Sequence, residues 1–233
     1  MKYMGSKQRI AKHILPIILA DRMPNQTYVE PFCGGCNSLD KVQNPRVAND
    51  SNKYLIALFK EMQSKSLFNP PEIDEGQYKH IRENKKEYED WLVGYVGFNL
   101  SFAAKFFGGY ARDKAGLRDY ASEARRNLVA QQKNIEGIEF TCGDYTEIFI
   151  PDCSIIYCDP PYRNTTKYST KDFDHESFYD WCRLKVNEGH TVFVSEYNMP
   201  LDFECVWSKE LTSSLTQDTG SKKAIEKLFK LTK

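Results

Sequence analysis

The residues best suited to chemistry lie where a short apolar run, Ser154–Cys158, ends in the turn Asp159-Pro160-Pro161-Tyr162. The run has the length and composition of a buried strand. Proline cannot donate a hydrogen bond to a sheet and fixes its own φ, so the two prolines end the strand and stiffen the turn. A carboxylate, a rigid carbonyl group and an aromatic ring are thereby held close together. This combination is suited to gripping a flat ring that bears an amino group.

A glycine-containing stretch is the second candidate site. Gly34 and Gly35 follow the β-prone run Thr27–Phe32 and lead into a predicted helical turn at Leu39 and Val42. Glycines at the first strand-to-helix turn of a nucleotide-binding fold let the backbone approach a ligand closely. The stretch is therefore a candidate for binding a cofactor.

The same stretch contains a Cys-x-x-Cys pair, Cys33 and Cys36, which raises metal binding or redox chemistry as an alternative. A structural zinc site usually takes four ligands, with a second pair at similar spacing. The remaining cysteines, which are scattered from residue 142 to residue 205, offer no such pair. We therefore expect no metal requirement.

Two aspartates follow the next two predicted strands. Asp50 ends the run Arg46–Asp50, about twenty residues after the first strand, where α/β folds place a carboxylate that accepts hydrogen bonds from ribose hydroxyls. Asp144 follows the run 137–142 and could accept a hydrogen bond from an exocyclic amine of an adenine ring. The alternatives are that Asp50 caps the helix expected over 51–65 and that Asp144 is an ordinary turn residue.

Between residues 66 and 135 the strand pattern disappears, and we expect a mainly helical region with irregular, aromatic- and glycine-rich chain over 97–112. From Lys105 to Arg126 six basic residues stand against three acidic ones. Basic side chains interleaved with aromatic ones suit a surface that contacts phosphates and stacks on bases. A solvated charged face is the alternative.

Bulk composition places few limits on function. The 233 residues suffice for one α/β core with a modest insertion. Lysines and arginines number 32 and offset 32 aspartates and glutamates, so a nucleic-acid surface could arise only by local clustering. No apolar run approaches the ~20 residues that cross a bilayer, and no secretory leader precedes the seven cysteines. We expect reduced cysteines, a cytoplasmic protein with no membrane partner, and a monomer as the simplest state.

The turn Asp159–Tyr162 resembles the catalytic motif of S-adenosylmethionine-dependent amino-methyltransferases that act on adenine N6 in DNA, the Dam-like group. The Tyr-x-Gly-x-Lys start, from Tyr3 to Lys7, resembles the segment with which these enzymes contact the cofactor. Phe32–Cys36 resembles their Phe-x-Gly-x-Gly loop, although Cys36 stands where the pattern has its last glycine. The corner Ser195–Asn198 and the strand predicted over Phe203–Trp207 also resemble this family, so the matching segments span nearly the whole chain.

The resemblance implies a doubly wound, mostly parallel, Rossmann-like α/β sheet formed by residues 1–65 and 136–233, with residues 66–135 inserted as a mainly helical target-recognition region. It implies that S-adenosyl-L-methionine is bound by Tyr3, Lys7, Phe32, Gly34, Gly35, Asp50, Asp144, Tyr145 and Asp159. The expected DNA contacts are Lys105, Tyr110, Arg112, Lys114, Arg118, Arg125, Arg126 and, in the loop after the turn, Lys167.

The implied reaction is methyl transfer to N6 of a flipped-out adenine in double-stranded DNA, catalysed by Asp159, Pro160, Pro161 and Tyr162. Hydrogen bonds from the amino group to the carboxylate and the proline carbonyl would localise the nitrogen lone pair, and the tyrosine ring would fix the plane of the base. The alternatives are methylation of cytosine N4, of adenine in RNA or of glutamine in a protein, and a non-catalytic DNA-binding protein that has kept the fold.

Overall fold

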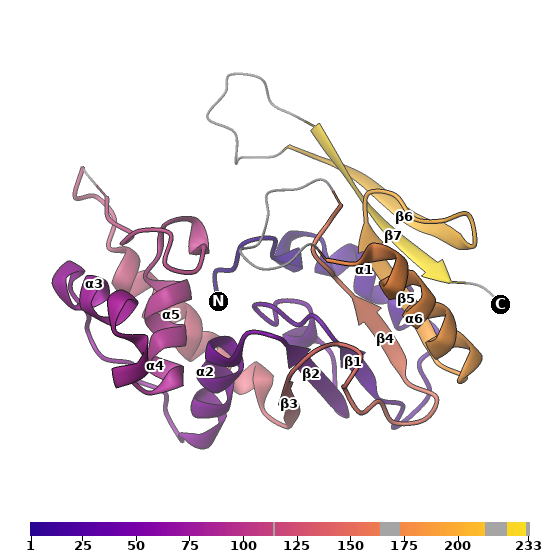
Figure 1. The fold of residues 1–233 in the computed structure, drawn as a ribbon, viewed down its shortest axis with the longest axis horizontal. Coiled ribbons are helices and arrows are strands. Elements are labelled where there is room, and N and C mark those ends of the chain that lie inside the picture. Colours follow the sequence, from indigo (N-terminus) through magenta and orange to yellow (C-terminus); the bar gives the residue numbers. More distant parts are fainter. Residues whose placement is uncertain (114, 164–172, 213–222, 232–233) are drawn as a thin grey trace. The chain divides into compact units, whose positions relative to one another are not determined.

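The protein is described by a computed structural model over residues 1–113, 115–163, 173–212 and 223–231 (Figure 1). Its longer helices are α1 Ala11–Ile18, α2 Lys53–Ser64, α3 Glu75–Glu83, α4 Asp90–Gly94, α5 Tyr120–Gln132 and α6 His175–Asn187. Its strands are β1 Tyr28–Glu30, β2 Arg46–Asp50, β3 Ile138–Cys142, β4 Ile155–Cys158, β5 Thr191–Glu196, β6 Phe203–Thr212 and β7 Lys223–Leu231.

The strands form a seven-stranded sheet in the order β3-β2-β1-β4-β5-β7-β6. The pairs β2–β3, β1–β4 and β4–β5 are parallel, whereas β7 runs antiparallel to both β5 and β6. The strand order reverses at β1, and open α/β sheets bind their ligands at such a reversal, beyond the carboxyl ends of the strands. The predicted α/β class with a mostly parallel sheet is confirmed.

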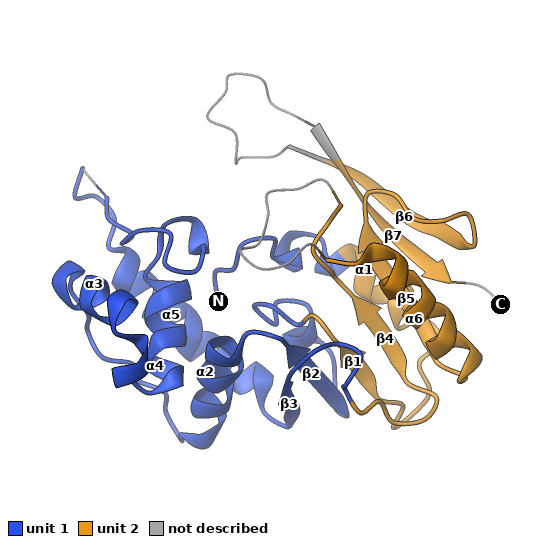
Figure 2. Ribbon diagram, in the orientation of Figure 1, with its two compact units in different colours: residues 1–12, 33–148 blue, residues 13–32, 149–233 orange. Residues whose placement is uncertain are grey.

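The chain divides into two compact units (Figure 2). Unit 1 comprises residues 1–12 and 33–148, and unit 2 comprises residues 13–32 and 149–233. The predicted target-recognition region, 66–135, lies within unit 1. The two units are described separately below.

In unit 1, helix α2 packs on β3 through Phe59 and Phe140, whose rings stack with centroids 5.0 Å apart. Arg46, at the start of β2, is buried. Its guanidinium donates to the carbonyls of Leu39, Asn134 and Glu136 at 2.8–3.0 Å, which satisfies a buried charge that would otherwise be costly. Arg46 thus ties the start of the strand to the chain on either side of it.

The helical part of unit 1 has an irregular centre, as the aromatic and glycine content predicted. Helix α4 continues into a π-helical segment, Tyr95–Asn99, a rare geometry that often marks functional sites. The chain then forms a short hairpin closed by a bridge between Ser101 and Tyr110. The Tyr78 hydroxyl lies 2.8 Å from that of Ser101 and anchors this hairpin to α3.

In unit 2, every residue of β4 is buried, which agrees with the continuous apolar run in the sequence. Asp174 is the N-cap of helix α6, and its side chain accepts a hydrogen bond from the Ser177 backbone N–H. Phe178 of α6 packs edge-to-face against Phe32, with centroids 5.7 Å apart. Among the described residues no helix is long and apolar enough to cross a membrane.

Gly94 allows α4 to approach α2 closely, and its replacement gives a test of this packing. A Cβ atom at Gly94 would lie 2.1 Å from the backbone carbonyl oxygen of Tyr54. We expect Gly94→Ala to lower the free energy of unfolding by about 1–3 kcal/mol, measured by urea denaturation, because the backbones must separate. Gly76→Ala is the control, since its Cβ would meet only the Asp74 side chain, at 3.3 Å. Equal midpoints for the two variants would contradict the close approach.

Candidate active site

The turn Asp159–Tyr162 lies at the carboxyl end of β4 in unit 2, directly after the buried Cys158. Pro160 is buried, and Asp159 and Tyr162 are half-buried. The neighbouring parallel strand β5 ends at the same edge, with Cys158 paired to Val194, and this brings the residues after β5 close to the turn. The turn predicted to be catalytic is therefore the end of a central, buried strand.

Tyr162 is held by contacts from two other strands of unit 2. Its hydroxyl donates to Glu226 Oε2 of β7 at 2.8 Å, and its ring lies edge-to-face to Tyr197, with centroids 4.8 Å apart. Burial raises the pKa of Tyr162 well above its usual range, and the neighbouring charges of Asp159 and Glu226 raise it further. The phenol therefore stays protonated and acts as a hydrogen-bond donor.

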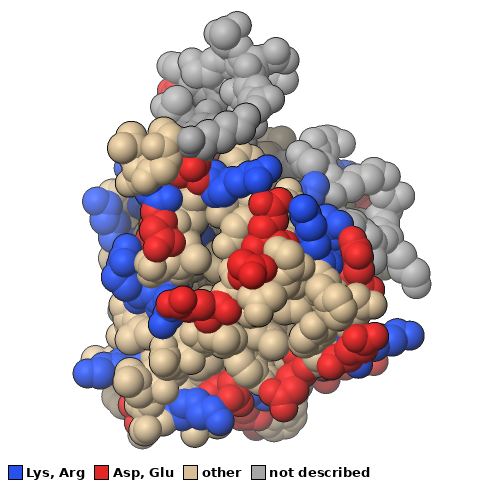
Figure 3. Space-filling view, turned by 90° about the vertical axis from the view of Figure 1, so that its left-hand side faces the viewer, with Lys and Arg blue, Asp and Glu red and all other residues tan. Residues whose placement is uncertain are grey.

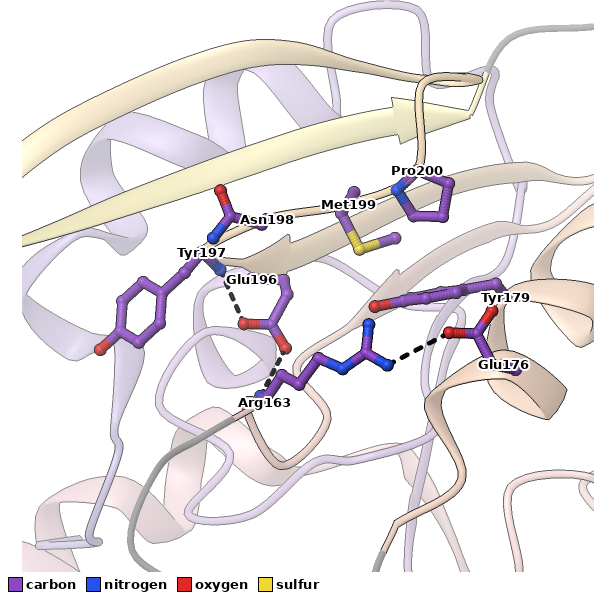
Figure 4. Close-up of a pocket in the computed structure, with 8 residues that line it drawn as sticks. All are labelled: Arg163, Glu176, Tyr179, Glu196, Tyr197, Asn198, Met199 and Pro200. Atoms are coloured by element: carbon purple, nitrogen blue, oxygen red, sulfur yellow. Dashed lines mark hydrogen bonds and ion pairs between the residues drawn. The ribbon is translucent and has the colours of Figure 1, made fainter.

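Glu196, the last residue of β5, connects the turn to the sheet. Its side chain is only 1% exposed, and its two carboxylate oxygens accept from the backbone N–H groups of Tyr197 at 2.7 Å and Arg163 at 3.1 Å (Figure 4). Arg163 immediately follows the predicted catalytic turn, so this carboxylate fixes the end of the turn. The pKa of Glu196 is raised to about 7, chiefly by burial and in part by the charges of Asp159 and Glu226, while the two N–H groups act to lower it.

A pocket of about 470 Å³ opens beside Glu196 (Figure 4). Arg163, Glu176, Tyr179 and the segment Glu196–Pro200 line it. The Arg163 guanidinium reaches across to Glu176 at 3.3 Å. The pocket adjoins the turn through Glu196 and Arg163, so a group bound there would lie close to the candidate catalytic residues.

Unit 1 brings the glycine stretch together with Asp50, as predicted. Gly34 has φ +46°, which only glycine adopts without strain, and its N–H donates to Asp50 Oδ2 at 3.1 Å. The other oxygen, Oδ1, accepts from the Asn52 N–H at 2.9 Å. Asn52, and not Asp50, caps helix α2. Burial raises the pKa of Asp50, opposed by these two hydrogen bonds.

Asp144 lies beyond the end of the neighbouring parallel strand β3, where Asp50 pairs with Cys142. Its Oδ1 accepts from the Thr146 N–H at 2.9 Å and the Thr146 hydroxyl at 2.6 Å, which makes it a turn residue in its local geometry. Tyr145 beside it is half-buried. Two carboxylates thus follow adjacent strands of unit 1.

The N-terminal segment covers the glycine stretch. A Cβ atom on Gly34 would lie 2.7 Å from the ring of Tyr3, and one on Gly35 would lie 2.6 Å from the Tyr3 Cβ. The absence of side chains on these glycines therefore makes room for Tyr3. Lys7 donates to the carbonyl of Gly5 at 3.2 Å.

Phe32 belongs to unit 2, as Asp159 does, whereas the other residues predicted to bind the cofactor lie in unit 1. Its ring packs against Phe173 and Phe178, with centroids 5.8 and 5.7 Å away. The Phe32 ring is therefore also part of the hydrophobic core around α6.

The basic residues predicted to contact DNA fall into two groups, according to whether they form an ion pair within the protein. Three arginines form ion pairs with glutamates: Arg112 with Glu75, Arg118 with Glu123 and Arg125 with Glu72, each at 2.7–2.8 Å. Lys105 and Arg126 are exposed and form no ion pair with any described residue. On the side of the molecule where α3, α4 and α5 lie, basic and acidic side chains are interspersed (Figure 3).

Tyr110 is half-buried, and its hydroxyl donates to the carbonyl of Ile73 at 3.0 Å. A hollow of about 480 Å³ in the same unit is lined by Asn69, Ser122, Arg125, Arg126, Val129 and Ala130. Lys114 and Lys167, also predicted to contact DNA, lie outside the described residues.

Within the described parts of the chain, no group of three or more His, Cys, Asp or Glu side chains is placed to hold a metal ion. Cys33 and Cys36 are buried, reduced thiols.

Comparison with known proteins identifies the family. The family model for D12 class N6 adenine-specific DNA methyltransferases matches residues 3–227, nearly the whole chain. This chain belongs to that family. The match includes the glycine stretch, both strand-end aspartates and the turn Asp159–Tyr162, so the predicted relationship is confirmed.

Individual relatives are more distant. The type II methyltransferase M.FokI of Planomicrobium okeanokoites is 22% identical over 209 residues, which cover 79% of this chain but 32% of that protein. The chain thus spans about a third of the length of this relative.

Two solved structures named as methyltransferases are also similar. The yhhF protein of Escherichia coli is 8% identical, with a TM-score of 0.37, over 96% of this chain and 85% of that one. SMU.472, solved as a complex with SAH, is 12% identical, with a TM-score of 0.39, over 99% of this chain and 54% of that one. At these TM-scores we rest no argument on either structure.

Two acidic residues of this D12 family member were not among the predicted site residues. Glu196 follows a buried apolar run as Asp159 does, and this shared position after a predicted strand is a signal that could have identified it. Glu226 carries no such signal, because it lies inside the C-terminal strand and meets Tyr162 only through the pairing of β7 with β5.

The raised pKa of Glu196 predicts a pH-dependent stability. The folded chain holds this proton up to about pH 7, whereas an unfolded glutamate loses it near 4.5, so unfolding becomes easier as pH rises between these values. We expect the free energy of unfolding to fall as the pH rises over this range, and to fall further in the wild type than in Glu196→Gln. The difference between the two falls should be at most about 3 kcal/mol. Urea denaturation at both ends of the range measures this, with the exposed Glu204→Gln as control. Parallel pH profiles for wild type and Glu196→Gln would contradict it.

Proposed function

We propose that this chain transfers a methyl group from S-adenosyl-L-methionine to N6 of a flipped-out adenine in double-stranded DNA. The observation that carries the proposal is the turn Asp159–Tyr162 at the carboxyl end of a buried parallel strand, in a chain that belongs to the D12 family. The family description names adenine N6, so the cytosine, RNA and protein alternatives are not favoured. A chain with this activity works where DNA lies, which in a bacterial or phage-infected cell is the cytoplasm.

The proposed acceptor site is the turn itself. The Asp159 carboxylate and the Pro160 carbonyl accept hydrogen bonds from the amino group of the adenine, which localises the nitrogen lone pair that the ring would otherwise withdraw. Pro160 and Pro161 fix these two acceptors relative to each other. Tyr162 stacks on the base and sets its plane. As the nitrogen forms its bond to the methyl carbon, the bond from that carbon to the sulfonium sulfur would break, and the nitrogen would then release its proton to solvent. No strong base is needed for this loss, so positioning accounts for most of the catalysis.

The proposed cofactor residues of unit 1 are Tyr3, Lys7, Gly34, Gly35, Asp50, Asp144 and Tyr145, together with Phe32 and Asp159 of unit 2. S-adenosylmethionine supplies a sulfonium-bound methyl group to the nitrogen nucleophile. Its fit to unit 1 is supported by a positive-φ glycine turn beside a half-buried carboxylate, with a second carboxylate after the next strand. Asp50 suits the ribose hydroxyls, since each carboxylate oxygen has a lone pair beyond the backbone N–H group it already accepts.

Residues 66–135 are proposed to recognise DNA and to act with the rest of the chain as a monomer. Lys105 and Arg126 are the strongest candidates for phosphate contacts, because they are exposed and form no ion pair among the described residues. Arg112, Arg118 and Arg125 would first have to leave their glutamate partners. Tyr110 and, outside the described residues, Lys114 and Lys167 complete the proposed surface.

Asp159→Ala tests the reaction. We expect methyl transfer from tritium-labelled S-adenosylmethionine to unmethylated double-stranded DNA to fall by about two to three orders of magnitude or more, because the acceptor of the amino group is removed. Asp152→Ala, an exposed aspartate of the loop before β4, is the matched control and should stay active. Near-normal turnover by folded Asp159→Ala would contradict the catalytic role of the turn. A wild-type chain that methylates RNA or cytosine instead would contradict the substrate.

Removal of the Lys105 and Arg126 side chains tests the DNA surface. We expect the double alanine variant to bind all DNA sequences more weakly and to reduce the salt slope of log K by about 0.9 for each phosphate that is no longer neutralised. Fluorescence anisotropy at several salt concentrations measures both quantities. Lys60→Ala, which removes an exposed charge on α2 outside residues 66–135, is the control. An unchanged slope would mean that these two side chains belong to an ordinary solvated surface.

A further inference from the structure

The phenol of Tyr162 is anchored by a residue far away in the sequence. Glu226 lies 64 positions later, on β7, and its Oε2 accepts a hydrogen bond from the Tyr162 hydroxyl at 2.8 Å. Strand β7 pairs with β5, and Glu196 at the end of β5 is opposite Lys227. The C-terminal strand thereby carries a carboxylate to the distal end of the tyrosine ring.

The ring is contacted at two points by different strands. It lies edge-to-face to Tyr197, after β5, at a centroid distance of 4.8 Å and an interplanar angle of 84°. Its hydroxyl is held by Glu226. A tyrosine side chain has two rotatable bonds, so one lateral contact and one terminal hydrogen bond suffice to fix the plane of the ring.

The backbone of the turn is fixed by other means. Two prolines restrict φ at 160 and 161, and Glu196 holds the N–H of Arg163. Loss of the Glu226 side chain would therefore release the Tyr162 ring and leave the course of the turn unchanged. This separation makes the role of Glu226 testable by mutation.

The presence of an acid at position 226 has an electrostatic cost. Glu226 lies near enough to Glu196 for their charges to interact, and like charges destabilise one another. A charged acceptor also forms a stronger hydrogen bond with a phenol than a neutral one does. A glutamate at position 226 therefore strengthens the hydrogen bond to Tyr162 at the expense of repulsion between nearby acidic groups.

We propose that Glu226 is a positioning residue for methyl transfer, whose carboxylate fixes the plane of the Tyr162 ring before the target base arrives. This inference rests on the proposed function, in which Tyr162 stacks on the adenine. Preorganised stacking aligns the nitrogen for attack, and a small misplacement of the base is enough to slow such a step strongly. Glu226 touches neither the base nor the methyl group in this scheme and acts through Tyr162.

The first test needs no activity. In protein labelled with ¹³C-tyrosine, the Tyr162 signal is assigned by its disappearance in Tyr162→Phe. We expect Glu226→Ala to shift this signal and to speed flipping of the ring, whereas Glu226→Gln, which keeps an acceptor, should change it little. Glu204→Ala, an exposed carboxylate on β6, is the control. An unchanged Tyr162 signal in folded Glu226→Ala would overturn the proposal.

The second test is a double-mutant cycle on methyl transfer. We expect Glu226→Ala to lower kcat roughly ten- to hundredfold without changing KM for S-adenosylmethionine, and Glu226→Gln to retain most of the rate. In a Tyr162→Phe background Glu226→Ala should have no further effect, because both changes remove the same hydrogen bond. Additive losses, or equal losses in the Ala and Gln variants, would overturn the proposal. A wild-type chain without methyl transfer would instead refute the proposed function, and the tyrosine signal would then decide the positioning role alone.

Discussion

Parallel strand pairing is the constraint on which both candidate sites depend. Parallel neighbours end at the same edge of a sheet, so residues that follow separate strands are brought together. In unit 1 this applies to β2 and β3, which are followed by Asp50 and Asp144. In unit 2 it applies to β4 and β5, which are followed by the turn Asp159–Tyr162 and by the corner after Glu196. Without parallel register, the residues that follow the two strands of each pair would not lie at the same edge of the sheet.

Carboxylates at these strand ends bind backbone N–H groups that would otherwise lack partners. Asp50 accepts from Gly34 and Asn52, and Glu196 accepts from Arg163 and Tyr197. Each therefore fixes the shape of a loop in addition to any contact with a ligand. Burial disfavours the charged form of both side chains, the form that accepts these hydrogen bonds best, and therefore raises the pKa of each. The loops at the proposed sites are thus shaped by acidic groups that the protein holds partly out of water, at a cost in stability.

In the helical part of unit 1, ion pairs reduce the number of basic side chains that are available to contact DNA directly. Arg112, Arg118 and Arg125 are each neutralised by a glutamate, at distances typical of surface ion pairs. These pairs contribute little to stability, so a phosphate could displace the glutamates at small cost. Lys105 and Arg126, which form no ion pair with a described residue, could contact a phosphate without this exchange.

The sequence by itself predicted the strands that precede the glycine stretch, Asp50, Asp144 and the turn Asp159–Tyr162, because apolar runs and proline breaks act over a few residues. It also predicted that the glycine stretch and Asp50 belong to one site. Only the tertiary structure decided that Tyr3 fills the space above the glycines, that Phe32 packs on α6, and that Glu226 holds Tyr162. These contacts join residues far apart in the chain, and the antiparallel register of β7 that creates the last of them is set by packing of the whole sheet.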